Sequence, residues 1–298
     1  MPTTSHPQVS IGLPVHNGQA FVGDTLRSLL AQTFTDFELL ISDNGSRDET
    51  WEICAEFAGG DSRIRLYRSE QNRGVAWNYR NVLEHARGQY FRWASADDLF
   101  AAESLACCVE VLEQRPDAVL CYPKTTLIDK AGNTLGQYED NLNLQDEDPC
   151  SRYRQVIRRL GLVNIIYGLM RTEVVRRTGL IGSYPGADEA FVSELALHGK
   201  FVEIDRPLFF RRMHDQASSG LQSGEEVQVY LNPASEGKVV PRTWYCQRDR
   251  LASVMRAPLP LRDRMQLIGF LLREMLIGRR QYGKELRALI NVHLRRWA

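Results

Sequence analysis

Between Val9 and Tyr122 the chain alternates short apolar runs of strand length with longer stretches in which apolar residues recur at helical spacing. This alternation is typical of βαβ units, in which each helix returns the chain so that successive strands lie parallel in one sheet. We therefore predict the α/β class with a mainly parallel, Rossmann-like sheet. The predicted strands are residues 9–15, 37–42, 64–67, 90–94 and 118–122, and the predicted helices are residues 21–32, 46–60, 75–87 and 101–114.

Local signals mark the ends of two of these helices. Ser46 and Glu49 have the spacing of a capping box, which predicts that a helix begins there. Gly88 follows the third helical stretch and predicts its end, because glycine adopts a left-handed cap easily.

An acidic run divides the chain into two parts. Residues 137–150, QYEDNLNLQDEDPC, follow a predicted hairpin and are nearly devoid of core-forming side chains, which predicts a long surface loop. The second part has predicted helices at 151–160 and 188–198 and predicted strands at 167–170, 201–204 and 208–211.

Composition excludes several classes of protein. Lys and Arg number 37, and so do Asp and Glu, which argues against a nucleic-acid binder with a basic surface. The six cysteines show no CxxC spacing, and several lie in apolar runs, as buried thiols do, which favours the reducing cytoplasm. No signal segment and no run of about 18 apolar residues occurs, so we expect no membrane-spanning helix.

The charge is unevenly distributed along the chain. Residues 242–298 contain 13 Lys and Arg but only 4 Asp and Glu. A helical apolar face, flanked by arginines, lies within this tail and consists of Met265, Leu267, Ile268, Leu271, Leu272, Met275 and Leu276. We expect either packing on the rest of the chain or on a second copy in a homodimer, or peripheral contact with an anionic membrane at its cytoplasmic face.

Polar clusters follow the first four predicted strands. In an open parallel sheet, ligands bind outside the carboxyl ends of the strands, so clusters at these ends predict a common site. Each cluster alone is also ordinary turn chemistry. The clusters are Pro14-Val15-His16-Asn17, Asp43-Asn44-Gly45-Ser46, Asn72-Arg73-Gly74 and Asp97-Asp98.

The Asp97-Asp98 pair points to a divalent metal. Two adjacent carboxylates repel each other unless a cation or a turn backbone compensates them. Mg²⁺ and Mn²⁺ bind through one or two carboxylates together with phosphate oxygens and water. The alternative is a helix N-cap just before Leu99. The sequence contains neither GxxxxGK[ST] nor GxGxxG, which argues against P-loop and dinucleotide-binding versions of this architecture.

From Val9 to about Ser219 the chain resembles the family 2 glycosyltransferases, inverting enzymes with an A-type fold that binds nucleotide-diphosphate sugars. The resemblance lies in ordered motifs: VSIGLPVHNG, ELLISDNGSRDET, QNRGVAWNYRNV, WASADDLF, GADEAFVSELALHGKF and RRMHDQASS. It implies a catalytic domain at 1–220, with a donor half at 1–136 and an acceptor half at 151–220, and a loop with a helical tail at 221–298.

The resemblance also implies roles for donor-side residues. Binding of the nucleotide sugar is expected at Pro14, Val15, His16, Asn17, Asp43, Arg73 and Asp97, and metal binding at Asp98 and His214. The implied cofactor is Mn²⁺ or Mg²⁺, and a UDP-sugar is the favoured donor. This chain departs from the family pattern at two positions, because His16 stands where tyrosine is common and Ser95 occupies the first acidic position of the longer DxDD pattern.

On the acceptor side, Asp188 matches the family's base position. An inverting transfer needs a carboxylate that accepts the proton of the acceptor hydroxyl. Helix N-capping is the alternative role for Asp188. Asn164, Tyr167 and Glu189 are further candidates for the acceptor side, although the first two also suit a buried strand.

The expected activity is transfer of a sugar, of hexosyltransferase type, to an acceptor hydroxyl on a sugar or lipid-linked molecule, in bacterial-type polysaccharide, glycolipid or glycoconjugate synthesis for the cell envelope. Two rivals remain open. A sugar nucleotidylyltransferase usually has a Gly-rich phosphate loop, which PVHNGQAF lacks. A binding protein without turnover would not need Asp97, Asp98 and Asp188 together.

Overall fold

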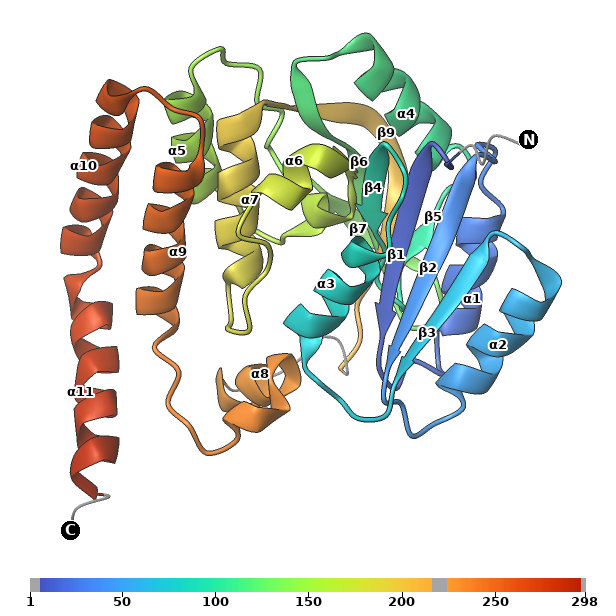
Figure 1. Cartoon of the computed structure of the whole chain (residues 1–298), viewed down its shortest axis with the longest axis horizontal. Helices are drawn as coiled ribbons and strands as arrows, with labels where there is room; N and C mark the ends of the chain where they lie inside the picture. The colour runs from blue at the N-terminus through green and yellow to red at the C-terminus, as the bar shows by residue number, and fades with distance from the viewer. Residues whose placement is uncertain (1–5, 216–223, 296–298) are drawn as a thin grey trace.

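The computed structural model describes residues 6–215 and 224–295, and shows one twisted sheet with helices on both faces (Figure 1). Within these residues the sheet has nine strands in the order β3-β2-β1-β4-β8-β6-β9-β5, with β7 paired to β6. The strands are β1 (Val9–Val15), β2 (Phe37–Asn44), β3 (Ile64–Ser69), β4 (Tyr90–Trp93), β5 (Leu99–Phe100), β6 (Ala118–Ile128), β7 (Thr134–Tyr138), β8 (Leu169–Arg171) and β9 (Lys200–Arg212).

The first four strands of the order are parallel, as the alternation predicts. β1 pairs in parallel with β2 and β4, and β2 pairs in parallel with β3. Both faces of this part are covered, so β1 and β2 are buried along nearly their whole length. The remainder is mixed, because β5, β7 and β8 pair only in the antiparallel sense while β6 and β9 run parallel. The α/β class is confirmed.

Helices cover the two faces of the sheet and form a separate layer at one side (Figure 1). α3 and α7 contribute to one apolar core, and α1 and α4 contribute to the other. The helices are α1 (Val22–Leu30), α2 (Thr50–Gly60), α3 (Val75–Glu84), α4 (Ser104–Gln114), α5 (Pro149–Arg159), α6 (Thr172–Arg177), α7 (Ala187–His198), α8 (Gly224–Leu231), α9 (Arg242–Arg256), α10 (Leu261–Ile277) and α11 (Arg279–Arg295), with short 3₁₀ helices at Asn164–Tyr167 and Pro233–Ser235.

The capping box predicted at Ser46 is wrong. α2 begins at Thr50, and the Ser46 hydroxyl instead accepts a hydrogen bond from the backbone N–H of Asn17 at 2.9 Å. This serine therefore joins the loops that follow β1 and β2.

Gly88 does not cap α3, which ends at Glu84. A Cβ atom at Gly88 would lie 2.5 Å from the backbone nitrogen of Ser10, so only glycine allows the chain to enter β4 so close to β1. The same junction is held by Glu38, which is buried and accepts hydrogen bonds from Arg65 and Arg87 at 2.9 Å each.

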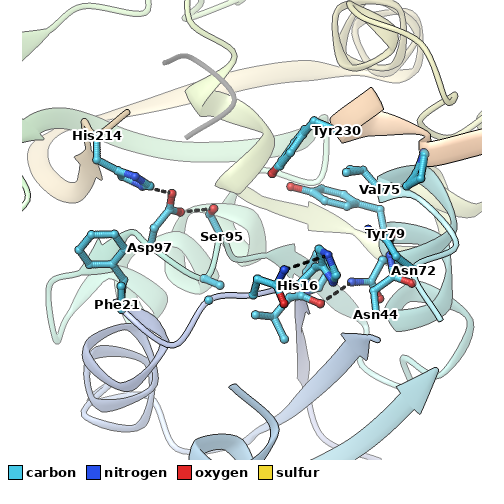
Figure 2. Close-up of a pocket in the computed structure, with 18 of the residues that line it drawn as sticks. His16, Phe21, Asn44, Asn72, Val75, Tyr79, Ser95, Asp97, His214 and Tyr230 are labelled. Atoms are coloured by element: carbon cyan, nitrogen blue, oxygen red, sulfur yellow. Dashed lines mark hydrogen bonds and ion pairs between the residues drawn. The ribbon is translucent and has the colours of Figure 1, made fainter. Parts of the chain in front are cut away.

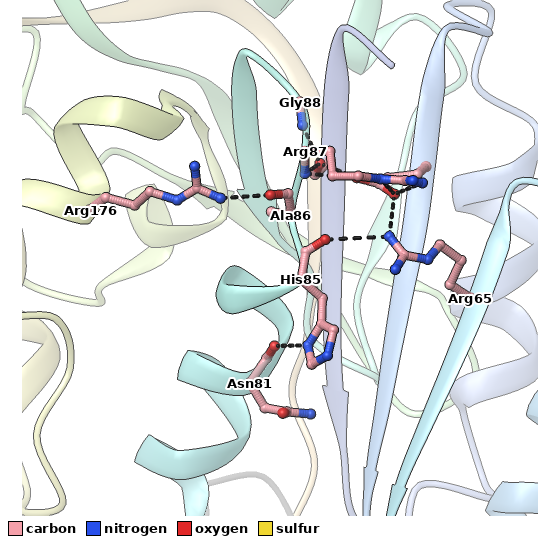
Figure 3. A network of polar contacts seen from close by, with 9 residues as sticks. Arg65, Asn81, His85, Ala86, Arg87, Gly88 and Arg176 are labelled. Carbon is pink, nitrogen blue, oxygen red and sulfur yellow. Dashed lines mark hydrogen bonds and ion pairs between the residues drawn. The ribbon is translucent and has the colours of Figure 1, made fainter. Parts of the chain in front are cut away.

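These bonds outweigh the effect of burial and lower the pKa of Glu38. Figure 3 shows the same region, where Arg65 also donates to the His85 carbonyl and Arg176 donates to the Ala86 carbonyl at 2.6 Å. The end of α3 is thereby tied both to the parallel strands and to α6.

The acidic segment 137–150 is not a core-free surface loop. Leu142 and Leu144 are fully buried in the core, and the backbone of Leu144 pairs with that of Phe201 on β9 in both directions. Leu142 and Leu144 have the i and i+2 spacing of residues on one face of a strand. The many acidic residues around them in the sequence mask this short apolar pattern. The helix predicted at 101–114 begins later, at Ser104, and is preceded by the short strand β5 at Leu99–Phe100, which pairs with β9.

The tail forms the separate helical layer. α9 packs on α7, and α10 packs on α9 and α5, around Tyr153, Val254, Leu267 and Leu271. No helix among the described residues has both the length and the apolar character needed to cross a bilayer.

Candidate functional site

The carboxyl ends of the parallel strands meet at a cavity of about 370 Å³ (Figure 2). We call it the first cavity. Its wall includes the residues after β1, from Pro14 to Gly18, and the residues after β4, from Ser95 to Asp97. Asn44 from the second cluster and Asn72 from the third also line it, so the predicted convergence of the four strand-end clusters is present.

The loop after β1 is held in shape by its partner after β2. Asn17 adopts φ 50°, a left-handed conformation that asparagine tolerates better than most residues. Its side-chain carbonyl accepts from the backbone N–H of Arg47 at 2.9 Å. Burial lowers the pKa of the neighbouring His16 despite opposing contributions from the Asn44 backbone and Asp43. His16 thus presents a neutral ring to the cavity at neutral pH.

Asp97 and Asp98 have different environments although they are adjacent. The Asp97 carboxylate faces the first cavity, accepts from the Ser95 hydroxyl and lies 2.9 Å from Nε2 of His214 (Figure 2). Burial by itself would raise the pKa of Asp97, but the bonds from His214 and Ser95 lower it overall.

The Asp98 side chain is only 3% exposed, and its Oδ1 accepts from the backbone N–H of Arg212 at 2.8 Å. Burial and the neighbouring Asp97 charge raise its pKa well above the usual range. Its backbone carbonyl accepts from the Thr25 hydroxyl at 2.9 Å. Asp98 does not cap a helix, so that alternative is wrong; it joins the loop after β4 to the end of β9.

A second cavity of about 620 Å³ adjoins the first. The two share parts of their walls at Tyr79, Ser95, Asp97 and Tyr230, so the Asp97 carboxylate stands where they meet. Asp98 reaches the second cavity, and the opposite wall is formed by the loop before α7 and the first turn of that helix. A molecule in one cavity can therefore approach a molecule in the other beside Asp97.

Asp188 lies in the first turn of α7 and lines the second cavity. The N-cap of α7 is Gly186, in a left-handed conformation, so the capping role for Asp188 is wrong. Among the described residues, the hydrogen bond to the Asp188 carboxylate comes from the backbone N–H of Glu189 at 3.0 Å, and no side chain pairs with it. Burial and the charge of Glu189 raise its pKa.

Glu189 is placed differently. One of its oxygens lies 2.6 Å from Arg242 and the other 3.5 Å from Arg250, both on α9. Two guanidinium groups therefore hold its charge and orient it toward the helical tail. Of these two neighbouring carboxylates, Asp188 is the one free to accept a proton.

The other expected residues occupy supporting positions. Asp43 is fully buried, with Oδ1 accepting from the backbone N–H of Ser46 at 3.0 Å, and is not part of either cavity wall. Arg73 stacks on Trp77, with 4.4 Å from guanidinium carbon to ring centroid, and likewise lines neither wall. Tyr167 lines the second cavity, whereas Asn164 is buried beneath it and accepts from Arg211 at 2.6 Å.

Four further residues in the cavity walls were not given a role of their own by the sequence. Asn44 and Asn72, from the second and third strand-end clusters, line the first cavity and are hydrogen-bonded to each other at 3.0 Å. Tyr79 on α3 and Tyr230 on α8 line both cavities (Figure 2). Asn44 lies beside Asp43 in a cluster that the sequence analysis did single out. A tyrosine in the middle of a helical pattern, by contrast, ordinarily predicts core packing, so the sequence did not indicate that Tyr79 and Tyr230 face a cavity.

The described residues contain no group of three or more His, Cys, Asp and Glu side chains that could hold a metal by themselves. The side chains of Asp97 and His214 nevertheless suit a divalent metal ion that takes its other ligands from a bound phosphate group and water. Mg²⁺ and Mn²⁺ commonly use one or two protein ligands and complete their shells with phosphate oxygens and water. A carboxylate facing an imidazole at the edge of a cavity meets that requirement.

Comparison with known proteins identifies relatives of this chain. Residues 10–164 match the model of the family described as Glycosyl transferase family 2. An uncharacterised glycosyltransferase of Rickettsia typhi is 32% identical over 133 residues, which are 44% of this chain and 41% of that protein. Chondroitin synthase of Escherichia coli is 29% identical over 129 residues, which are 43% of this chain and 19% of that protein. The chain thus matches less than half the length of either relative.

Solved structures extend the likeness over nearly the whole fold. Residues 1–349 of TarS from S. aureus, in complex with UDP-GlcNAc, align with a TM-score of 0.68 at 16% identity, covering 95% of this chain and 80% of that one. The mannosyltransferase PcManGT from Pyrobaculum calidifontis, in complex with GDP-Man and Mn²⁺, aligns with a TM-score of 0.52 at 14% identity, covering 98% and 87%. At these identities the likeness concerns the fold, which is of the glycosyltransferase A type.

Proposed function

The chain belongs to glycosyltransferase family 2, and on that premise we propose that it transfers a hexose from a nucleotide-diphosphate sugar to an acceptor hydroxyl with inversion at the sugar carbon. The observation that carries this proposal is the arrangement of two cavities that meet at Asp97, with the unpaired carboxylate of Asp188 in the wall of the second. A binding protein without turnover has no use for that carboxylate.

The first cavity is the proposed donor site. It lies outside the carboxyl ends of parallel strands, where nucleotides bind in open α/β sheets. We favour a UDP-sugar, since TarS, the neighbour with the higher TM-score of the two, was crystallised with UDP-GlcNAc. The donor halves of the two proteins share the fold, and His16, with its neutral ring, would face the base. GDP-sugars are the competing donors, given the mannosyltransferase complex.

We propose that Asp97 and His214 bind the metal, rather than Asp98 and His214. Asp98 also reaches the second cavity, but it is buried and its Oδ1 accepts from the Arg212 backbone, so we give it the part of positioning the loop. Mn²⁺ or Mg²⁺, when bound by Asp97 and His214 together with the donor diphosphate, would act as a Lewis acid toward the leaving group. The two residues orient each other by their 2.9 Å contact.

Asp188 is the proposed general base. Its carboxylate takes the proton of the acceptor hydroxyl while the hydroxyl oxygen forms a bond to the anomeric carbon. The bond from that carbon to the diphosphate breaks at the same step, and its electron pair leaves with the nucleotide diphosphate. A single displacement of this kind inverts the configuration. Burial favours the step because the raised pKa of Asp188 makes it a stronger base than an exposed aspartate.

The acceptor is proposed to be a hydroxyl of a free or lipid-linked sugar in the second cavity. We place the reaction in cytoplasmic synthesis of a cell-envelope polysaccharide or glycoconjugate. The chondroitin synthase relative supports polysaccharide synthesis as the reaction class. We keep the proposed division of the chain into a catalytic part at 1–220 and a tail at 221–298, with the tail contributing Tyr230 to the walls of both cavities. A sugar nucleotidylyltransferase finds no support in the family match.

Binding of UDP and GDP, measured by thermal shift with and without Mn²⁺, tests the donor and metal roles. Wild type is expected to bind UDP about tenfold or more weakly in EDTA, whereas Asp97→Ala should bind equally weakly in both conditions. Asp205→Asn is the control and should bind UDP as the wild type does, because its side chain is 90% exposed and lines neither cavity. Equal UDP affinity with Mn²⁺ and with EDTA in the wild type would remove the metal from the proposal.

A further inference from the structure

α10 and α11 expose a second apolar face, on the side opposite their packed face. Leu267, Phe270 and Leu271 of α10 are buried against α9 and α5. Large apolar side chains also point to solvent along both helices, and Leu276 is 66% exposed. Ile277 is 67% exposed but lies off the side of α10 that Met265 and Leu276 share. The exposed apolar side chains that we call the outer face are Leu261, Met265, Leu272, Leu276, Leu286 and Ile290.

Their spacing shows that they form a continuous stripe within each helix. Met265, Leu272 and Leu276 are separated by two turns and by one turn, so they lie on one side of α10. Leu286 and Ile290 are one turn apart on α11. Folding of this chain alone does not account for the stripe, because the buried face already supplies the packing of the layer.

The charge beside the outer face is of one sign. Among the described side chains of the two helices, the exposed charged groups are all cations, namely Arg262, Arg273, Arg279, Arg280, Lys284 and Arg287. The carboxylates of the same helices are partly buried or engaged. Glu285 accepts from the backbone N–H of Thr243 at 3.0 Å, and Glu274 lies 4.0 Å from Arg158.

The cations form rows along the apolar stripe. Arg262 and Arg273 are three turns apart on α10, and Arg280, Lys284 and Arg287 are spaced by about one turn on α11. Each helix therefore presents an apolar stripe with a basic flank, the pattern of helices that lie in the interface of an anionic bilayer. Long arginine side chains can reach lipid phosphates while their stems cover apolar surface.

We propose that the outer face of α10 and α11 docks this protein on an anionic membrane surface, with the apolar stripe at the level of the acyl boundary and the basic flank on the lipid headgroups. A second copy of the chain is disfavoured as the occupant, since a two-fold contact sets like surfaces together and the outer face offers no exposed carboxylate to meet the arginines.

The position of the outer face is compatible with turnover. α10 and α11 lie at the edge of the molecule farthest from β1–β3, with α9 and α7 between them and the sheet (Figure 1). A membrane at that edge leaves the first cavity accessible to a water-borne donor. Membrane docking does not depend on the proposed transfer reaction, and a failure of one does not affect the other.

Co-sedimentation with vesicles tests the proposal on the full chain. Vesicles of phosphatidylcholine alone are compared with vesicles containing about one third phosphatidylglycerol, at low and at high salt. We expect binding only to the anionic vesicles, with loss at high salt. Leu276→Ser should weaken the partition coefficient by about tenfold, whereas the matched control Leu135→Ser, which alters a leucine 59% exposed on β7, should not change it.

The role of the basic side chains is tested by the same co-sedimentation assay. Arg273→Glu with Arg280→Glu is expected to lower binding by about tenfold or more. The control, Arg27→Glu with Arg177→Glu, changes the net charge equally on α1 and α6 and should leave binding intact. Circular dichroism shows that each variant is folded, and sugar transfer to a soluble acceptor should be unaffected in all of them.

Three results would overturn the proposal. Equal binding to both kinds of vesicle would exclude the role of the cations. Absence of binding to anionic vesicles would exclude membrane docking altogether. A stable dimer in light scattering that Leu276→Ser dissociates, together with absence of vesicle binding, would assign the outer face to a second copy.

Discussion

Two neighbouring carboxylates in the first turn of α7 differ in whether they can accept a proton. Asp188 has no side-chain partner among the described residues and lines the second cavity, whereas Glu189 is held by Arg242 and Arg250. The difference arises from α9, whose Arg242 and Arg250 pair with Glu189 and leave Asp188 facing the second cavity.

Asp188→Asn is therefore expected to lower the rate of transfer by about 10² to 10⁴, the usual contribution of a positioned base, with donor affinity unchanged. Initial rates and UDP affinity measure the two effects. Glu189→Gln is the matched control and should retain activity within about tenfold, because the charge that it removes holds this side chain against Arg242 of α9. Normal turnover in Asp188→Asn, with loss in Glu189→Gln, would transfer the role to Glu189.

The same carboxylate predicts the acidic limb of the pH profile. The base acts only when ionised, and burial raises the pKa of Asp188, so activity should fall with decreasing pH at values above the range of an exposed aspartate. The quantity to measure is kcat/KM across pH 4 to 8 in buffers of constant ionic strength. Donor affinity over the same range separates loss of the base from loss of binding. A flat profile down to about pH 4 would contradict this assignment.

At the scale of elements, the segment between β7 and α5 behaves as part of the core. Leu142 and Leu144 fill positions between the sheet and α7, and Leu144 extends the backbone pairing of β9. The acidic side chains of residues 146–148 are exposed, whereas Asp140 is buried. The segment therefore links the two parts of the chain rigidly instead of separating them.

Leu144→Ala is expected to lower the free energy of unfolding by about 2 to 5 kcal/mol, since it removes a fully buried leucine and leaves a cavity. Urea denaturation monitored by fluorescence provides the measurement. Leu135→Ala, on the neighbouring strand β7 but 59% exposed, should cost less than about 0.5 kcal/mol. Equal effects of the two substitutions would mean that the segment is not packed as described.

At the scale of the whole molecule, a buried polar cluster joins elements from distant parts of the chain. Asp140 accepts from Thr125 on β6 at 3.2 Å and lies 3.4 Å from the side-chain nitrogen of Asn164. Asn164 in turn accepts from Arg211 on β9. Burial is the main cause that raises the pKa of Asp140 to about 7.

This raised pKa predicts the direction in which stability changes with pH. The folded chain holds the Asp140 proton up to about pH 7, whereas the unfolded chain releases it near pH 4, so this group makes stability fall as pH rises between those values. Asp140→Asn should remove this contribution, which is at most about 4 kcal/mol, and should stabilise the protein at pH 8 relative to wild type. Urea midpoints at pH 5 and pH 8 for both proteins measure it.

The difference in stability between Asp140→Asn and wild type should be smaller at pH 5 than at pH 8. Asp129→Asn, at the exposed turn between β6 and β7, is a matched control that lies outside the buried cluster. A destabilisation of Asp140→Asn that is the same at both pH values would show that the carboxyl is not protonated in the folded protein.

The sequence by itself determined the α/β class, the first four parallel strands and the position of the site at their carboxyl ends. Apolar runs and helical spacing are local patterns, and the rule that ligands bind at strand ends needs no knowledge of distant contacts. The positions of Asp97, Asp188 and the loop from Pro14 to Asn17 followed from these patterns and from the resemblance to the family.

Only the tertiary structure decided which member of each neighbouring pair is available for chemistry. Adjacent side chains at a turn have partners far along the chain. All four carboxylates line the second cavity, but Asp98 accepts from the backbone of Arg212 and Glu189 pairs with Arg242. Asp97 faces His214, and Asp188 has no side-chain partner among the described residues. The same holds for Leu144, whose burial depends on its pairing with Phe201. Local periodicity carries no information about such long-range partners, because they are brought together only when the sheet and the helical layer close.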